Sequence, residues 1–202
     1  MKKMYLSLCF AIACLSAFAQ NKESELRPFK VDASVGYAMP AGSGSKGGVL
    51  AALEPKYAVT SNLSLGLRLE VAVVARFSGY DENGEPLDVN VKASGGYLAT
   101  GDYYFSNNYS LRPFAGAGAG IYTIASAEAT SSGSEGAAAG TKFGGMIRAG
   151  IEAGHFRFGV EYNIVPSSKL DGFDANGDPA QITSRNSYLG IKIGVCIGGG
   201  RK

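Results

Sequence analysis

The stretch Leu63–Arg76 reads LSLGLRLEVAVVAR, and every second residue from Leu63 to Val73 is apolar. Successive side chains of a β-strand point to opposite faces. The stretch therefore predicts a strand with one face of Leu and Val and another of Ser, Gly, Arg, Glu and Ala. The same period of two recurs in three further segments, Phe29–Met39, Phe156–Val165 and Tyr188–Ile197. A chain built from such segments is expected to be all-β.

Four segments that alternate less cleanly complete a set of about eight expected strands, and they are Val49–Val59, Val89–Phe105, Tyr109–Ala125 and Lys142–Ala153. The connections alternate in length. The short ones are Thr60–Asn62, Ser106–Asn108 and Gly154–His155, and the long ones are Pro40–Gly48, Phe77–Asp88, Ser126–Thr141 and Pro166–Arg185. Outer-membrane barrels combine short periplasmic turns with longer extracellular loops. We therefore expect an eight-stranded antiparallel up-and-down transmembrane β-barrel, with both termini and His155 on the periplasmic side.

The period alone does not say which face of the strands looks inward. A soluble barrel such as a lipocalin has the same period with an apolar interior. Glycines on the polar face favour a polar interior, because they make room for long side chains in a narrow barrel. Aromatic residues near the strand ends favour membrane girdles, and these are Phe29, Tyr57, Tyr103, Phe105, Tyr109 and Phe156 at the short turns and Tyr37 and Tyr162 towards the long loops. The apolar face is therefore expected to contact lipid, and a soluble periplasmic lipocalin-like ligand-binding barrel is the alternative.

The first 19 residues have the pattern of a cleaved signal peptide. A positive start, Met1–Lys3, precedes the apolar run Met4–Leu15 and a small-x-small signature, Ala17–Ala19. A lipoprotein cysteine at Cys14 is disfavoured because the apolar run continues past it. We expect export through the signal and one barrel domain over residues 20–202.

Charge and cysteine content exclude several classes of function. The chain has 19 Lys and Arg against 17 Asp and Glu, and loss of the signal removes Lys2 and Lys3, which leaves equal numbers. A nucleic-acid partner is not expected without a basic surplus. Cys196 alone, once Cys9 and Cys14 leave with the signal, cannot form an internal disulfide. No cofactor is expected, because a single histidine and a single cysteine offer no obvious zinc or haem site.

Charged residues gather on the faces expected to look inward. An eight-stranded barrel is just wide enough to be filled by its own side chains, and isolated buried charges are costly, so these residues are expected to pair. A narrow conduit with a modest basic bias is the alternative. Lys142 shares the face of the expected network, which comprises Lys30, Asp32, Glu54, Lys56, Arg68, Glu70, Arg76, Lys92, Asp102, Arg112, Arg148, Glu152, Arg157, Glu161 and Lys192.

Two acidic loop segments resemble turn formers more than metal sites. Oxygen ligands at alternate positions beside a glycine are able to hold Ca²⁺, but neither segment has the closing glutamate of an EF-hand loop. Asn-Gly is also a strong turn former. The weak calcium candidates are Asp81, Asn83, Glu85, Asp174, Asn176 and Asp178.

The chain resembles the outer membrane protein beta-barrel domain family of Gram-negative bacteria, whose small barrels include the OmpA, OmpX and OmpW types. The resemblance is carried by the signal end Ala17–Gln20, the segment Leu111–Gly120 and the closing segment Tyr188–Gly194. It implies an outer-membrane location with lipid and lipopolysaccharide around the barrel. It also implies insertion by the barrel assembly machinery and a monomeric state.

The first functional expectation is a non-enzymatic barrel with a filled polar lumen and four surface loops, acting in envelope structure, adhesion or surface interaction. The alternative is a narrow channel or an OmpW-like route for small hydrophobic compounds. Catalysis is not expected, because small outer-membrane enzymes use a histidine to activate a nucleophile or water. The single histidine, His155, falls in a short turn away from the long loops.

Overall fold

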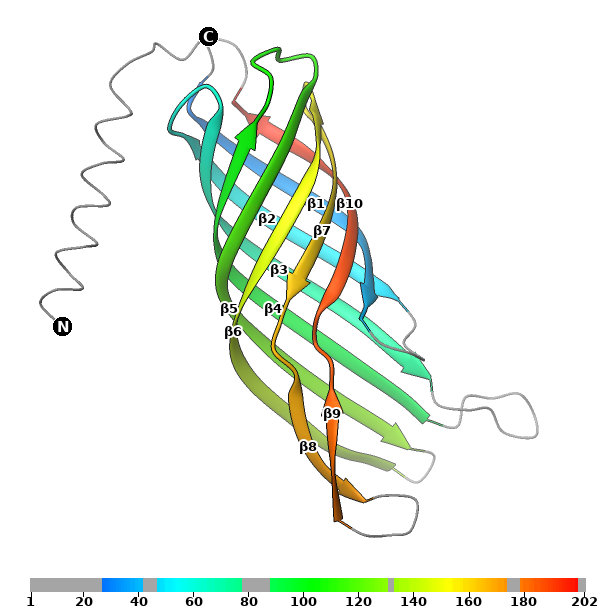
Figure 1. Cartoon of the computed structure of the whole chain (residues 1–202). Helices are drawn as coiled ribbons and strands as arrows, with labels where there is room; N and C mark the ends of the chain where they lie inside the picture. The colour runs from blue at the N-terminus through cyan, green and yellow to red at the C-terminus, as the bar shows by residue number, and fades with distance from the viewer. Residues whose placement is uncertain (1–26, 42–46, 78–87, 131–132, 174–178, 200–202) are drawn as a thin grey trace, which may run out of the picture.

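The computed structural model describes residues 27–41, 47–77, 88–130, 133–173 and 179–199 (Figure 1). These residues form ten strands. Their bounds are β1 Phe29–Pro40, β2 Gly48–Ala58, β3 Leu63–Phe77, β4 Asp88–Tyr104, β5 Arg112–Thr130, β6 Gly133–Ala153, β7 Phe156–Ile164, β8 Ser168–Phe173, β9 Pro179–Ser184 and β10 Tyr188–Gly198. Within this part of the chain no helix is long and apolar enough to cross a membrane.

Eight of the strands close into an antiparallel barrel in the order β1-β10-β7-β6-β5-β4-β3-β2. The first and last strands pair directly, for example at Asp32 and Cys196, and this pairing closes the sheet. The remaining two strands, β8 and β9, form a separate two-stranded hairpin. The predicted eight-stranded antiparallel barrel is therefore confirmed.

The two ends of the barrel differ. At one end, here called the short-turn end, lie the connections β2–β3, β4–β5 and β6–β7, together with the start of β1 and the finish of β10. At the other end, β3 to β6 continue past their neighbours as an open sheet, as Figure 1 shows for β5 and β6 beyond β7. We call the part of this sheet beyond Val74 of β3 and before Gly145 of β6 the extension, and the barrel end that bears it the extension end.

Two segments predicted to be loops contain strands. Ser126–Thr141 was expected to be a loop, but β5 runs to Thr130 and β6 begins at Gly133. Ser126–Thr130 and Gly133–Thr141 are strand because the backbone ladder continues, with β5 paired to β4 as far as Thr130 and Thr130 paired to Gly133 of β6. Pro166–Arg185 was also expected to be a loop, and it contains the hairpin β8–β9.

The strand faces are oriented as a membrane barrel requires. In β7, exposed and buried residues alternate without exception. In β3, Leu67 is 67 % exposed and its neighbour Arg68 is 1 % exposed. Leu, Ile, Val and aromatic side chains therefore cover the outside, and charged side chains lie within the barrel. The lipocalin-like alternative, with an apolar interior and a wet exterior, is wrong.

Candidate functional site

The barrel interior holds most of the charged residues that the sequence assigned to it. Thirteen of them are buried, and they come from all eight barrel strands. These are Lys30, Asp32, Glu54, Lys56, Arg68, Glu70, Asp102, Arg112, Arg148, Glu152, Arg157, Glu161 and Lys192. Lys92 is half-buried near the extension end. The side chain of Arg76 lies outside the described residues.

Asp102 of β4 is the centre of the lumen network. Its carboxylate lies 2.7 Å from Arg148, 2.8 Å from Arg157 and 3.0 Å from Lys56. Lys56 also contacts Asp32 at 3.1 Å, and Arg157 contacts the same carboxylate at 2.9 Å. Each of these ions therefore has more than one opposite charge around it, which offsets the cost of taking it out of water.

Glu54 of β2 joins this centre to the next level of the barrel. Both of its carboxylate oxygens accept hydrogen bonds from the Arg148 guanidinium at 2.6 Å. This two-pronged arrangement is the strong geometry for an arginine and a carboxylate. The Thr100 hydroxyl donates to Glu54 at 2.5 Å, and Arg68 lies 3.5 Å from it.

Gly116 of β5 makes room for this centre. A Cβ at this position would lie 2.2 Å from Asp102 Oδ1 and 3.2 Å from Arg148 Nε. Any side chain at residue 116 would therefore displace the Asp102–Arg148 pair. Gly116 therefore gives long charged side chains space inside the barrel, as predicted for glycines on the polar face.

A second cluster fills the lumen at the short-turn end around Tyr104. Lys30 donates to the Tyr104 hydroxyl and to Glu152, each at 2.7 Å, and the hydroxyl donates to Glu152 at 2.8 Å. The Arg112 guanidinium lies 4.0 Å from the centre of the Tyr104 ring. It also donates to the backbone carbonyl of Ser61 at 2.8 Å, so it ties the β2–β3 turn to the wall of the barrel.

A third cluster lies on the other side of the centre. Arg68 contacts Glu161 at 2.7 Å and also pairs with Glu70, which accepts a hydrogen bond from Tyr188. Lys192 lies 2.8 Å from Glu161. The three clusters form one continuous network, because Arg68 also faces Glu54 and Arg157 lies 3.2 Å from Glu152.

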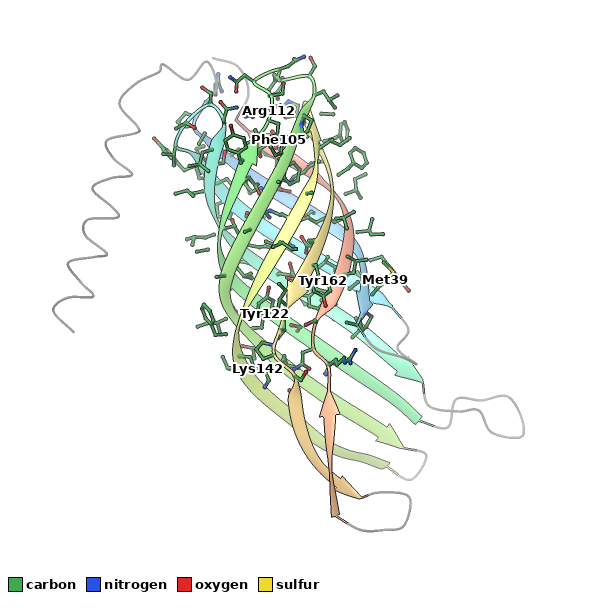
Figure 2. The ribbon with its side chains drawn as sticks, viewed as in Figure 1. Met39, Phe105, Arg112, Tyr122, Lys142 and Tyr162 are labelled. Carbon is green, nitrogen blue, oxygen red and sulfur yellow. The ribbon has the colours of Figure 1, made fainter. Side chains whose placement is uncertain are left out.

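An apolar layer lies inside the barrel beyond the charged clusters, and the alternation of polar and apolar residues does not predict it. Tyr122 spans the boundary, since its hydroxyl donates to Asn163 at 2.7 Å and its ring packs into the layer. Figure 2 shows Tyr122 between Arg112, near the short-turn end, and Lys142, towards the extension end. The signal in the sequence is that Leu50 and Leu98 place large apolar side chains on the otherwise polar faces of their strands. The layer comprises Ala38, Leu50, Ala72, Leu98, Tyr122, Ile124, Met146, Val165 and Tyr188.

Two lysines hold the base of the β8–β9 hairpin to the barrel. Lys92 of β4 donates to the Asn186 side chain at 2.6 Å, and Lys142 of β6 donates to the Ser167 carbonyl at 3.0 Å. Asn186 in turn donates to the Pro166 carbonyl at 2.6 Å. These bonds hold the segments before and after the hairpin at the extension end of the apolar layer.

The calcium candidates lie outside the described residues, at 78–87 and 174–178. Among the residues that the structure does describe, no group of three or more His, Cys, Asp or Glu side chains is arranged to hold a metal ion.

His155 and Cys196 meet at the short-turn end. His155 is exposed in the β6–β7 turn, and its Nδ1 lies 2.9 Å from the Cys196 carbonyl. Its Nε2 lies 3.5 Å from the Tyr109 hydroxyl. The Cys196 thiol is buried and lies 3.7 Å from Glu152. His155 therefore fastens the turn to β10, at the end of the barrel opposite the extension.

The sequence matches the model of a known family. The model of the outer membrane protein beta-barrel domain family matches residues 6–194. The chain belongs to this family. Membership places the barrel in the outer membrane, in agreement with its apolar exterior. Comparison with curated protein sequences gives no match.

Solved structures of other outer-membrane barrels share the fold. Neisserial surface protein A is 16 % identical with a TM-score of 0.56, and the match covers 86 % of this chain and 98 % of that one. The outer membrane protein OprG from Pseudomonas aeruginosa is 10 % identical with a TM-score of 0.52, and the match covers the same shares of the two chains. At these identities the likeness concerns the fold alone.

Proposed function

We propose that this family member is a non-enzymatic outer-membrane barrel that acts through the surface of its extension end, in adhesion or another surface interaction. In this proposal residues 1–19 are a signal peptide that is cleaved on export. The extension end faces the outside of the cell, and the short-turn end faces the periplasm.

The observation that carries this proposal is the extension itself. Here β5 and β6 remain paired to each other from Arg112 and Glu152 as far as Thr130 and Gly133, well past the end of β7. A rigid sheet that projects from a membrane anchor presents residues in a fixed arrangement, as a binding surface requires.

The filled lumen supports a structural barrel over a transporter. The charged clusters and the apolar layer occupy successive levels of the interior within the described residues. A narrow channel or an OmpW-like route for small hydrophobic compounds would need these packed side chains to move. The position of His155 supports a non-enzymatic role, because it lies at the end away from the extension.

The proposed surroundings of the barrel follow from its outer face. Phe29, Tyr57, Tyr103 and Phe156 are exposed near the short-turn end, where an aromatic girdle meets the membrane interface. Lipid and lipopolysaccharide are the proposed contacts of this face. We further propose insertion by the barrel assembly machinery and a monomeric barrel.

A shortened variant tests the proposed function. Ile124 and Gly140 are cross-strand partners, so Ala125–Ala139 can be replaced by Asn-Gly, which forms a two-residue hairpin turn. The barrel wall is kept, so the variant is expected to retain the difference in gel mobility between unboiled and boiled samples. Cells that display the intact chain are expected to be retained on serum-coated glass at least tenfold better than cells with the shortened variant.

The control is His155→Ala, which alters the opposite end and is expected to leave retention unchanged. Equal retention of cells with the intact and shortened chains would contradict the proposed function, as would retention by the intact chain no better than that of cells lacking it.

A further inference from the structure

We propose that the unpaired edge of β6 in the extension binds an extended segment of another polypeptide as an added strand. This inference rests on the proposed function, because it identifies the kind of partner that the extension end would take.

The edge is defined by strand pairing. On one side, β6 pairs with β5 along its whole length. On the other side, β6 pairs with β7 from Ala153 only as far as Gly145, opposite Ile164. The hairpin β8–β9 is a separate sheet and adds no strand to β6. Within the described part of the chain, Gly133–Gly144 therefore has a strand on one side only.

The opposite edge of the extension is much shorter. The last pair between β2 and β3 is Gly48 with Val74, and β3 ends at Phe77. Among the residues that the structure describes, Ala75–Phe77 is therefore what is left at that edge. The two edges differ in length because β7 ends at Ile164, whereas β5 and β6 remain paired to each other as far as Thr130 and Gly133.

The chemistry of such an edge specifies an extended chain. In an antiparallel sheet, successive residues direct their N–H and C=O groups to opposite sides, so about six residues of Gly133–Gly144 direct theirs away from β5. An added strand satisfies these groups in a regular ladder, and its alternate side chains supply specificity. Lys142 is occupied with Ser167 at the barrel end of the edge, so the free part is Gly133–Thr141.

The sequence leaves this part of the edge open. Natural edge strands are commonly protected by proline, lysine or a bulge. Gly133–Thr141 contains no proline and no lysine, and its one charged residue, Glu135, lies before the stretch Ala137–Thr141. It has one bulge, because Glu128 pairs with Glu135 and Ala127 with Ala137. The regular stretch Ala137–Thr141 follows the bulge.

A second copy of this chain in the same membrane fits the edge poorly. Copies in one membrane point the same way, so their β6 strands would run parallel. A two-fold axis between them would place identical edges face to face, with donors opposite donors at each level. A separate polypeptide segment is free to run antiparallel and to satisfy every group.

The test uses the full chain in lipid nanodiscs and a fluorescent ten-residue peptide of alternating threonine and valine with lysines at its ends. Because consecutive N–H groups point to opposite sides, Ala138→Pro and Ala139→Pro remove one N–H from the outer edge and one from the β5 ladder. Ala138→Thr and Ala139→Thr are the matched controls, since they change the side chain and keep the N–H.

The peptide is expected to bind the intact chain and both threonine variants within about twofold of each other, with slower amide hydrogen exchange at Ala137–Thr141. One proline variant is expected to fold normally and to bind at least tenfold more weakly. A peptide N-methylated at alternate residues is expected to lose binding to the same degree.

Absence of peptide binding to the intact chain would overturn the inference, and so would equal binding to both proline variants. Self-association of the nanodiscs that excludes the peptide would also overturn it, in favour of a second copy. If cells that display either proline variant are still retained on serum-coated glass, the β6 edge is not the surface that makes the contact. The proposed function is unaffected by that result.

Discussion

Replacing Asp102 by asparagine is expected to lower the free energy of unfolding by about 3–5 kcal/mol, the cost of breaking a buried ion pair by removing one partner. Asp102 is 1 % exposed and contacts Lys56, Arg148 and Arg157. Asparagine keeps the shape and removes the charge, so three cations lose a shared counter-ion. Urea unfolding of the barrel in lipid vesicles, followed by tyrosine fluorescence, measures the change.

Two controls test whether the loss of stability comes from the charge network. Tyr103→Phe alters the next residue in the chain, which faces outward, and is expected to change the free energy of unfolding by no more than about 0.5 kcal/mol. Adding Lys56→Met to Asp102→Asn removes one of the three cations that have lost this counter-ion, which lowers the excess of buried positive charge, and is expected to recover part of the loss. An unfolding free energy unaffected by Asp102→Asn, together with a large rise in planar-bilayer conductance, would show that the network is a gate and not a structural core.

Placing an arginine on the outer face is the second large change. Leu69→Arg is expected to cost about 2–4 kcal/mol, because a cation near the middle of the bilayer is poorly solvated. Leu69 is exposed on β3, and its cross-strand partners Leu53 and Tyr97 are exposed on the same face. The measurement is again the free energy of unfolding in lipid vesicles.

Thr141→Arg is the matched control for the outer face. Thr141 is also exposed, but it lies in the extension, where water surrounds the chain in our account. Its substitution is expected to change stability by about 0–1 kcal/mol, as for a position outside the hydrocarbon core. Equal costs at the two positions would mean that the extension is not outside the membrane.

The strands of the barrel wall could be predicted because their two faces differ in polarity. In β3, leucine and valine alternate with serine, arginine and glutamate, so the inward face is visible in the sequence. The extension could not be predicted in this way. Ala125–Ala139 consists mainly of Ala, Gly, Ser and Thr. Alanine alternates with polar residues only as far as Thr130, and no large apolar side chain marks an outer face, yet the described residues on both strands stay in the backbone ladder.

The pairing of charged residues within the lumen could not be predicted either. The alternation of side chains along a strand predicts that Arg148 and Glu54 point inward. Whether the two residues meet depends on the tilt and stagger of the strands. The two residues are 94 positions apart in the chain. The apolar layer was missed for a different reason, because Leu50 and Leu98 depart from the alternation on which the prediction depended.

The direction of the barrel in the membrane is the central claim of this account, and cysteine labelling of intact cells tests it most directly. Thr141→Cys places a thiol in the extension, Asn107→Cys places one at the short-turn end, and the native Cys196 is buried. We predict that a membrane-impermeant maleimide labels Thr141→Cys on intact cells and labels Asn107→Cys only after the outer membrane is permeabilised. Labelling of Asn107→Cys but not of Thr141→Cys on intact cells would contradict it.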